Sequence, residues 1–186
     1  MLNLPHTRFS QRVDNAVSRF GQYLSFIWLL LLAVIVPNVV MRYLFNEGRI
    51  EFEEIQWHLY AIGFLFGLSV AYSSDSHIRV DVVRERLSPQ TQAWVEWYGI
   101  LVLLLPFIIL VLTAALPLVA YSFANSEVSQ APGGLGYRWL IKACLPLSFM
   151  LLLITTLARL SRVSCYLFGW PGNQQSPDVA SDLGGT

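Results

Sequence analysis

The sequence contains little charge. Asp, Glu, Lys and Arg make up only 13% of its 186 residues, whereas hydrophobic residues make up 55%. A soluble globular domain usually carries about 25% charged residues. The formal net charge of +0 at pH 7 provides no basic excess to attract nucleic acid. This composition favours an all-α integral membrane protein over a soluble domain or a nucleic-acid-binding protein.

Cysteine and histidine are also scarce, which argues against redox and metal sites. Cys144 and Cys165 are the only cysteines, and within one helix they would lie about 30 Å apart, too far for a disulfide. Glu54 and His58 are four residues apart and could bind a metal, but an ordinary polar pair at the membrane interface is favoured over two isolated ligands. The motifs of nucleophilic, dithiol and phosphate-binding sites are missing. We therefore expect no catalytic residue, no metal and no cofactor.

Four apolar segments are long enough to cross the roughly 30 Å hydrocarbon core of a bilayer. Two are especially clear, since 55–71 holds no acid and no Lys or Arg, and 98–120 holds no charge at all. The prolines at 37, 106 and 117 should bend the first and third spans. We predict four transmembrane helices, at about 23–45, 53–73, 94–121 and 139–162.

The segments around these spans are more polar. Residues 1–22 place apolar side chains at helical spacing between arginines, which predicts a short amphipathic helix lying at the membrane surface, with no cleaved signal peptide. A second short surface helix is expected between spans two and three, at 80–87. Ser88-Pro89 should then open the next helix, as N-cap and first helical residue. Residues 23–166 form the predicted membrane domain, and 167–186 a flexible cytoplasmic tail.

The distribution of basic residues predicts the orientation. With the N-terminus inside, the inner segments hold eight Arg residues and the outer loops hold four Arg or Lys residues. This bias places both termini in the cytoplasm.

Candidate functional residues lie at the ends and along one face of the second span. Gly63, Gly67 and Ala71 are four residues apart, so they would form a face that another helix can approach closely, although such a spacing also arises by chance. Polar residues flank this span, and they could be solvated or could pair with each other, a partner subunit or lipid headgroups. The interface candidates in the flanks are Arg42, Asn46, Glu53, Glu54 and Trp57 on the outer side, and His77, Arg79 and Asp81 on the inner side. Arg138 and Lys142 are expected to anchor the fourth span at the lipid interface.

The centres of the four spans contain no ionisable side chain. A polar solute crossing lipid needs polar partners along its path. The chain is therefore expected to assist a larger membrane complex and to contain no substrate-binding residue of its own.

Several motifs together resemble a known family. Asn38-Val-Val-Met-Arg-Tyr-Leu-Phe-Asn46 closes the first predicted span, and Glu53-Glu54 opens the second. Gly67 lies late in that span, and His77-Ile-Arg-Val-Asp81 follows it. In order, spacing and layout, this set resembles the small membrane subunit of tripartite ATP-independent periplasmic (TRAP) transporters, the DctQ-like family, over roughly residues 20–165.

The resemblance implies a division of labour. A large permease subunit would move an organic acid or related solute, driven by a sodium or proton gradient. A periplasmic binding protein would deliver the solute, and the present chain would support the large subunit in the bacterial inner membrane. Lipids are the other expected partner. The alternatives are a free-standing homo-oligomeric channel or carrier of four-helix subunits, and a membrane enzyme with an unrecognised polar cluster.

Overall fold

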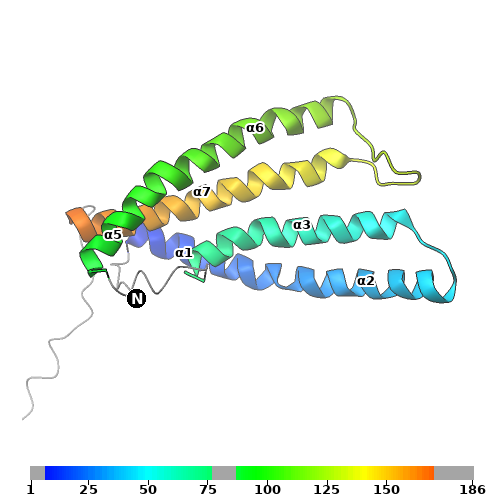
Figure 1. The fold of residues 1–186 in the computed structure, drawn as a ribbon, viewed down its shortest axis with the longest axis horizontal. Helices are drawn as coiled ribbons and strands as arrows, with labels where there is room; N and C mark the ends of the chain where they lie inside the picture. Colours follow the sequence, from blue (N-terminus) through cyan, green and yellow to red (C-terminus); the bar gives the residue numbers. More distant parts are fainter. Residues whose placement is uncertain (1–6, 77–86, 170–186) are drawn as a thin grey trace, which may run out of the picture.

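A computed structural model describes residues 7–76 and 87–169 of the chain, and every regular element in these ranges is a helix (Figure 1). The elements are α1 (Arg8–Leu24), α2 (Phe26–Leu44), α3 (Ile50–Ser73), α5 (Pro89–Tyr98), the π-helix η1 (Gly99–Leu104), α6 (Leu105–Ala124) and α7 (Arg138–Phe168).

These elements join into four helical rods that are long and apolar enough to cross a membrane, which confirms the predicted number of spans. The rods are Arg8–Leu44, Ile50–Ser73, Pro89–Ala124 and Arg138–Phe168. The first joins α1 to α2 through Ser25, which keeps right-handed helical backbone angles. Three of the rods are 31 residues or longer, so they exceed the roughly 20 residues that a bilayer requires.

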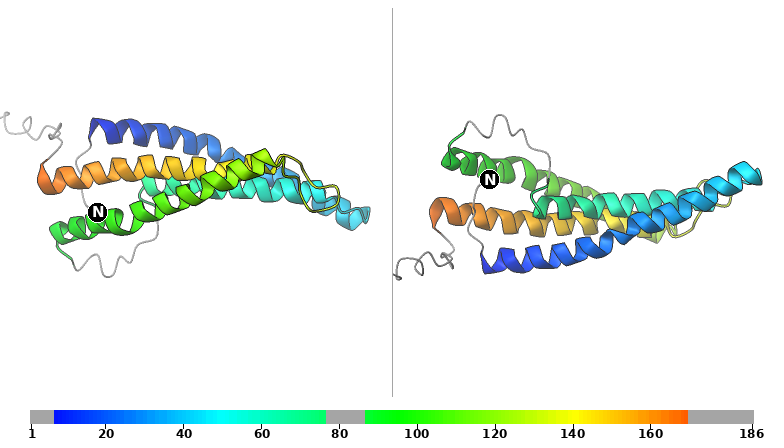
Figure 2. Two further views of the ribbon diagram at one scale, coloured as in Figure 1. Left: turned by 90° about the horizontal axis from the view of Figure 1, so that it is seen from above. Right: turned by 90° about the horizontal axis from the view of Figure 1, so that it is seen from below.

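The rods lie beside one another in the order α6, α7, α3, α2 (Figure 1). The helix α7 contacts α6 on one side and α3 on the other, and α2 packs against the far side of α3. The helices α1 and α5 also contact α7 near its C-terminal end. Both ends of the described chain lie at one end of the bundle, and the α2–α3 and α6–α7 connections lie at the other (Figures 1 and 2). We call these the termini end and the loop end.

Local sequence explains where the helices begin and end. The Ser88 side chain accepts a hydrogen bond from the Thr91 backbone amide, and Pro89 opens α5, as the sequence predicted. Thr7 caps α1 in the same way, through the Ser10 amide. Gly169 ends α7 in the left-handed conformation, which glycine adopts without steric penalty. The helix thus continues through Phe168, two residues beyond the predicted membrane domain.

The predicted bend in the third span coincides with a change of helix type. The π-helix Gly99–Leu104 ends two residues before Pro106, whose ring nitrogen cannot donate the usual backbone hydrogen bond. A wider turn is one way for a helix to accommodate such a break. The rod curves gently along its length (Figure 1). Pro37, Pro117 and also Pro146, which the sequence prediction overlooked, lie within continuous helices.

The predicted amphipathic N-terminal helix is present as α1, and its apolar side packs against the bundle. Its position at the membrane surface stays a prediction. Val13 and Val17 on α1 are buried against Ala158 of α7, with Val70 of α3 packed around them. An apolar stripe on a helix indicates only that the stripe is covered. Here the cover is provided by neighbouring helices.

Candidate functional site: two polar clusters at the ends of the bundle

Two polar clusters link the helices, one at each end of the bundle. The first surrounds Arg159 at the termini end. The Arg159 side chain is only 5% exposed, and its Nη1 lies 3.0 Å from Oδ1 of Asp75, just beyond α3. Its Nε donates to Oε1 of Glu96 on α5. Asp75 has a φ of 58°, a conformation that aspartate tolerates better than most residues. One guanidinium thus links α7 to α5 and to the end of α3.

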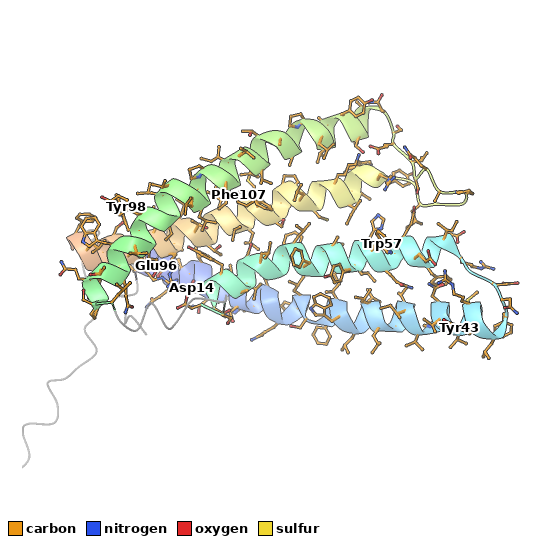
Figure 3. The ribbon with its side chains drawn as sticks, in the orientation of Figure 1. Asp14, Tyr43, Trp57, Glu96, Tyr98 and Phe107 are labelled. Atoms are coloured by element: carbon orange, nitrogen blue, oxygen red, sulfur yellow. The ribbon has the colours of Figure 1, made fainter. Side chains whose placement is uncertain are left out.

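Arg162, one turn further along α7, forms a second link at the same level. Its Nη1 lies 3.2 Å from Oδ2 of Asp14 on α1. The hydroxyl of Ser73 at the end of α3 donates to Oδ1 of the same carboxylate, at 3.0 Å. Asp14 and Glu96 both lie at this end of the bundle (Figure 3).

The two arginines therefore connect four segments that are distant in sequence. The sequence prediction placed Arg159 and Arg162 among the inner basic residues but missed this burial, and it did not single out Asp14, Asp75 or Glu96. The available signal was the three-residue spacing of the arginines, which puts both on one face of a helix. Buried guanidinium groups are rarely tolerated without carboxylate partners, so these acids were the natural candidates.

The second cluster lies at the loop end and centres on Glu54. Its carboxylate accepts a hydrogen bond from the Ser129 hydroxyl, and one from the Leu135 backbone amide at 2.6 Å. Both donors belong to the α6–α7 connection, so this glutamate ties that connection to the start of α3. The neighbouring His58 contributes Nδ1 to a contact with the Glu54 backbone oxygen. Within the described residues, no group of three or more His, Cys, Asp or Glu side chains could hold a metal ion.

The glycines of the α6–α7 connection allow it to fold around Glu54. A Cβ atom on Gly134 would lie 2.4 Å from the Ser129 Cβ and 2.9 Å from Oε1 of Glu54, so only glycine fits without displacement. Gly133 has a φ of 79°, in the left-handed region that glycine adopts readily. The Pro132-Gly-Gly turn therefore serves to close the connection over the end of α3.

Two ion pairs brace the same end. Arg42 at the end of α2 pairs with Glu53 at the start of α3, with both side chains substantially exposed. Lys142 pairs with Glu127 of the α6–α7 connection, so its ammonium has a protein partner in addition to the lipid interface expected for it. The hydrogen bond from Lys142 holds the pKa of the Glu127 carboxyl below its ordinary value.

The structure separates the other predicted residues. Asn46, with a φ of 53°, forms part of the α2–α3 connection, and the Trp57 side chain is 76% exposed. Arg138 opens α7, and its backbone amide donates to the Glu127 carbonyl at 3.2 Å. Ala71 is half-buried. His77, Arg79, Asp81 and the predicted surface helix lie outside the described residues.

The two glycines of the predicted small-residue face have different surroundings. Gly63 is buried, and an added Cβ would lie 3.1 Å from Cγ2 of Ile27 and 3.1 Å from the Trp28 ring. At Gly67, no atom of the described part of the chain lies within 4 Å of the corresponding position. Close approach at Gly63 thus serves contact between α3 and α2 of the same chain. A partner helix at Gly67 stays a prediction.

Leucine at these two positions should therefore act differently. Gly63→Leu should lower the free energy of unfolding by about 1–3 kcal/mol, because the added side chain is forced against α2. Gly67→Leu should leave the isolated chain nearly unchanged and weaken its association with a partner subunit. Thermal unfolding of the purified chain and co-purification of the partner measure the two effects. Equal losses of stability would contradict this distinction.

Comparison with protein families identifies the chain. The model of the DctQ component of tripartite ATP-independent periplasmic transporters matches residues 31–165. No match was found among curated proteins or solved structures. The matched range includes α7 through Cys165, and with it Arg159 and Arg162, as well as the loop-end cluster. Because the match covers well over half of the 186 residues and agrees with the four spans, the chain belongs to the DctQ family, the small membrane components of TRAP transporters.

Proposed function

We propose that this chain supports the large permease subunit of a TRAP transporter during uptake driven by a sodium or proton gradient. The solute would be an organic acid or a related compound, delivered by a periplasmic binding protein. The chain itself would not contact the solute. It would reside in the bacterial inner membrane with both termini in the cytoplasm, and labelling of a cysteine at Ser88 by an impermeant reagent from the periplasm would contradict that orientation.

One observation carries this proposal: the ionisable side chains gather at the two ends of the bundle. Arg159 and Arg162 occupy one end with their carboxylate partners, and the Glu54 and Lys142 interactions occupy the other. Between these clusters the four rods carry one charged residue, Arg19, which follows Asp14 by five residues on α1. A carboxylate entering the uncharged remainder of that region would lose its hydration without gaining a partner, at a cost of several kcal/mol.

The apolar exterior fits a subunit that packs beside another membrane protein. Large side chains such as Leu29 and Leu32 of α2, and Leu110 and Leu116 of α6, are more than half exposed. In a membrane such side chains face lipid or another apolar helix. The same exterior could serve a homo-oligomer, which is the alternative function.

Reconstitution distinguishes these functions. Proteoliposomes that contain the large subunit and this chain, supplied with the binding protein, should accumulate solute down an imposed sodium or proton gradient without ATP. Omitting this chain should reduce the initial rate of solute uptake by at least about tenfold. This corresponds to roughly 1.4 kcal/mol less stabilisation of the rate-limiting state of transport. Initial rates of radiolabelled solute uptake measure the effect.

The chain reconstituted alone provides the control. It should neither bind nor transport the solute. Saturable uptake by the chain alone would support the homo-oligomeric carrier, and an unchanged rate without this chain would show that the large subunit is sufficient.

A further inference from the structure

The outward face of α1 carries three arginines in a line. Arg8, Arg12 and Arg19 are all exposed, and their spacings of four and seven residues place them within about 40° of one another around the helix. The opposite face of α1, with Val13 and Val17, is buried against the bundle. The line therefore points away from the other helices.

These arginines differ from the basic residues that stabilise the fold. Arg159 and Arg162 have carboxylate partners within the bundle. The three arginines of α1 make no ion pair with any residue in 7–76 or 87–169. The acid on the same helix, Asp14, lies on the buried side and pairs with Arg162. Among the residues that the structure describes, the line is thus a positive surface without a carboxylate partner.

Contacts with α3 fix the depth of Arg19. The neighbouring Phe20 ring packs against Phe66, with ring centroids 5.5 Å apart. At Gly21, an added Cβ would lie 2.7 Å from Cγ1 of Val70. Both contacted residues belong to the uncharged stretch 55–71 of α3. Arg19 therefore lies level with the last turns of this apolar stretch.

Arg12 lies further toward the termini end, where α3 leaves the apolar layer. Asp14, two residues away, accepts a hydrogen bond from Ser73, the last residue of α3. Side chains on a helix tilt toward its N-terminus. The side chain of Arg19, the arginine furthest from the termini end, therefore points back toward the level of Asp14 and Ser73. The rise from Arg8 to Arg19 is about 16 Å, which brackets a headgroup layer of roughly 5–8 Å.

Exposed aromatic side chains flank the arginine line on one side. Phe9 is 50% exposed and Tyr23 is 76% exposed. Amphipathic segments that combine exposed aromatic and basic residues are typical of the membrane–water interface. The α1 surface thus offers apolar contact and positive charge at the level where α3 leaves its apolar stretch.

We propose that Arg8, Arg12 and Arg19 bind anionic phospholipid headgroups in the leaflet at the termini end of the bundle. A guanidinium group can donate two parallel hydrogen bonds to phosphate oxygens. The positive line complements a negatively charged lipid surface and gains less from a zwitterionic one. The binding stabilises α1 against α3 and α7, and it is independent of the transported solute.

Thermal unfolding of the full chain in lipid nanodiscs tests this site. Replacing part of the phosphatidylcholine with phosphatidylglycerol should raise the Tm by roughly 5 °C, because binding to the folded state alone stabilises it. The shift should shrink in high salt, which screens exposed charges. In R8Q/R12Q/R19Q the shift should disappear. In R8K/R12K/R19K most of it should remain, since the charge is retained.

A control that removes two arginines, in place of three, comes from the loop end. Arg49 and Arg138 form no ion pair within the described residues, so R49Q/R138Q should keep the full shift. The proposal is overturned if R8Q/R12Q/R19Q keeps the shift, or if the unmodified chain shows none. It is also overturned if inorganic phosphate added to phosphatidylcholine nanodiscs reproduces the shift, since a free anion would then suffice. Loss of large-subunit binding in R8Q/R12Q/R19Q with an unchanged lipid effect would assign the line to a protein partner.

Discussion

Arg159→Met should lower the free energy of unfolding by about 3–5 kcal/mol, because removing one member of a buried ionic cluster leaves its partners desolvated and uncompensated. The guanidinium is 5% exposed and contacts carboxylates from two other segments of the chain. Methionine keeps much of the side-chain length and flexibility, so the effect reports chiefly the lost charge. Thermal or denaturant unfolding in detergent micelles measures it.

Arg42→Met is the matched control. It also removes an arginine from an ion pair between helices, but the Arg42 side chain is 58% exposed and that of Glu53 is 40% exposed. Exposed pairs contribute about 0–1 kcal/mol. Similar losses at the two positions would show that the Arg159 cluster contributes no more than a surface pair. If Glu96→Met restores part of the stability of Arg159→Met, the lost carboxylate partner accounts for the deficit.

Glu54→Ala should release the α6–α7 connection from α3. The change removes a carboxylate that accepts hydrogen bonds from Ser129 and Leu135. Hydrogen bonds to a charged carboxylate are stronger than neutral ones, although access of water to the loop weakens them here. Amide exchange at Leu135 should then accelerate by at least about tenfold, because this amide loses its acceptor. Hydrogen–deuterium exchange with mass spectrometry of the peptide 126–137 measures it.

Glu47→Ala controls for loss of a negative charge at the loop end. The Glu47 side chain is exposed in the α2–α3 connection, and no interaction of it with another side chain occurs among residues 7–76 and 87–169. The exchange rate at Leu135 should stay within about twofold of the unmodified chain, as expected for a surface change. Equal acceleration by both variants would mean that Glu54 acts only through the charge of the surface.

The class of fold and the number of spans follow from the amino-acid sequence alone. Long apolar segments must cross lipid as helices, because the backbone has no water to bond there. The cap formed by Ser88 and Pro89 was equally readable, since it depends on a hydrogen bond only three residues away. The family resemblance was readable too, because order and spacing along the chain carry it.

Tertiary packing was needed to show what covers the apolar stripe of α1. An amphipathic stripe looks the same whether lipid headgroups or helices cover it. The buried side turned out to hold Val13 and Val17 against Ala158. Likewise, Gly63 and Gly67 share one face by spacing, but among the described helices α2 lies against Gly63 and none lies within 4 Å of a Cβ at Gly67.

Tertiary packing also decided which charged side chains pair with each other. Arg159 and Glu96 are 63 residues apart, and Glu54 and Leu135 are 81 residues apart. Local patterns cannot reveal which acid meets which base over such separations, because the crossing of the helices sets their distances. The sequence therefore placed the charges near the ends of the spans, while the packing of α1, α3, α5 and α7 decided which of them are buried partners and which remain exposed to lipid and water.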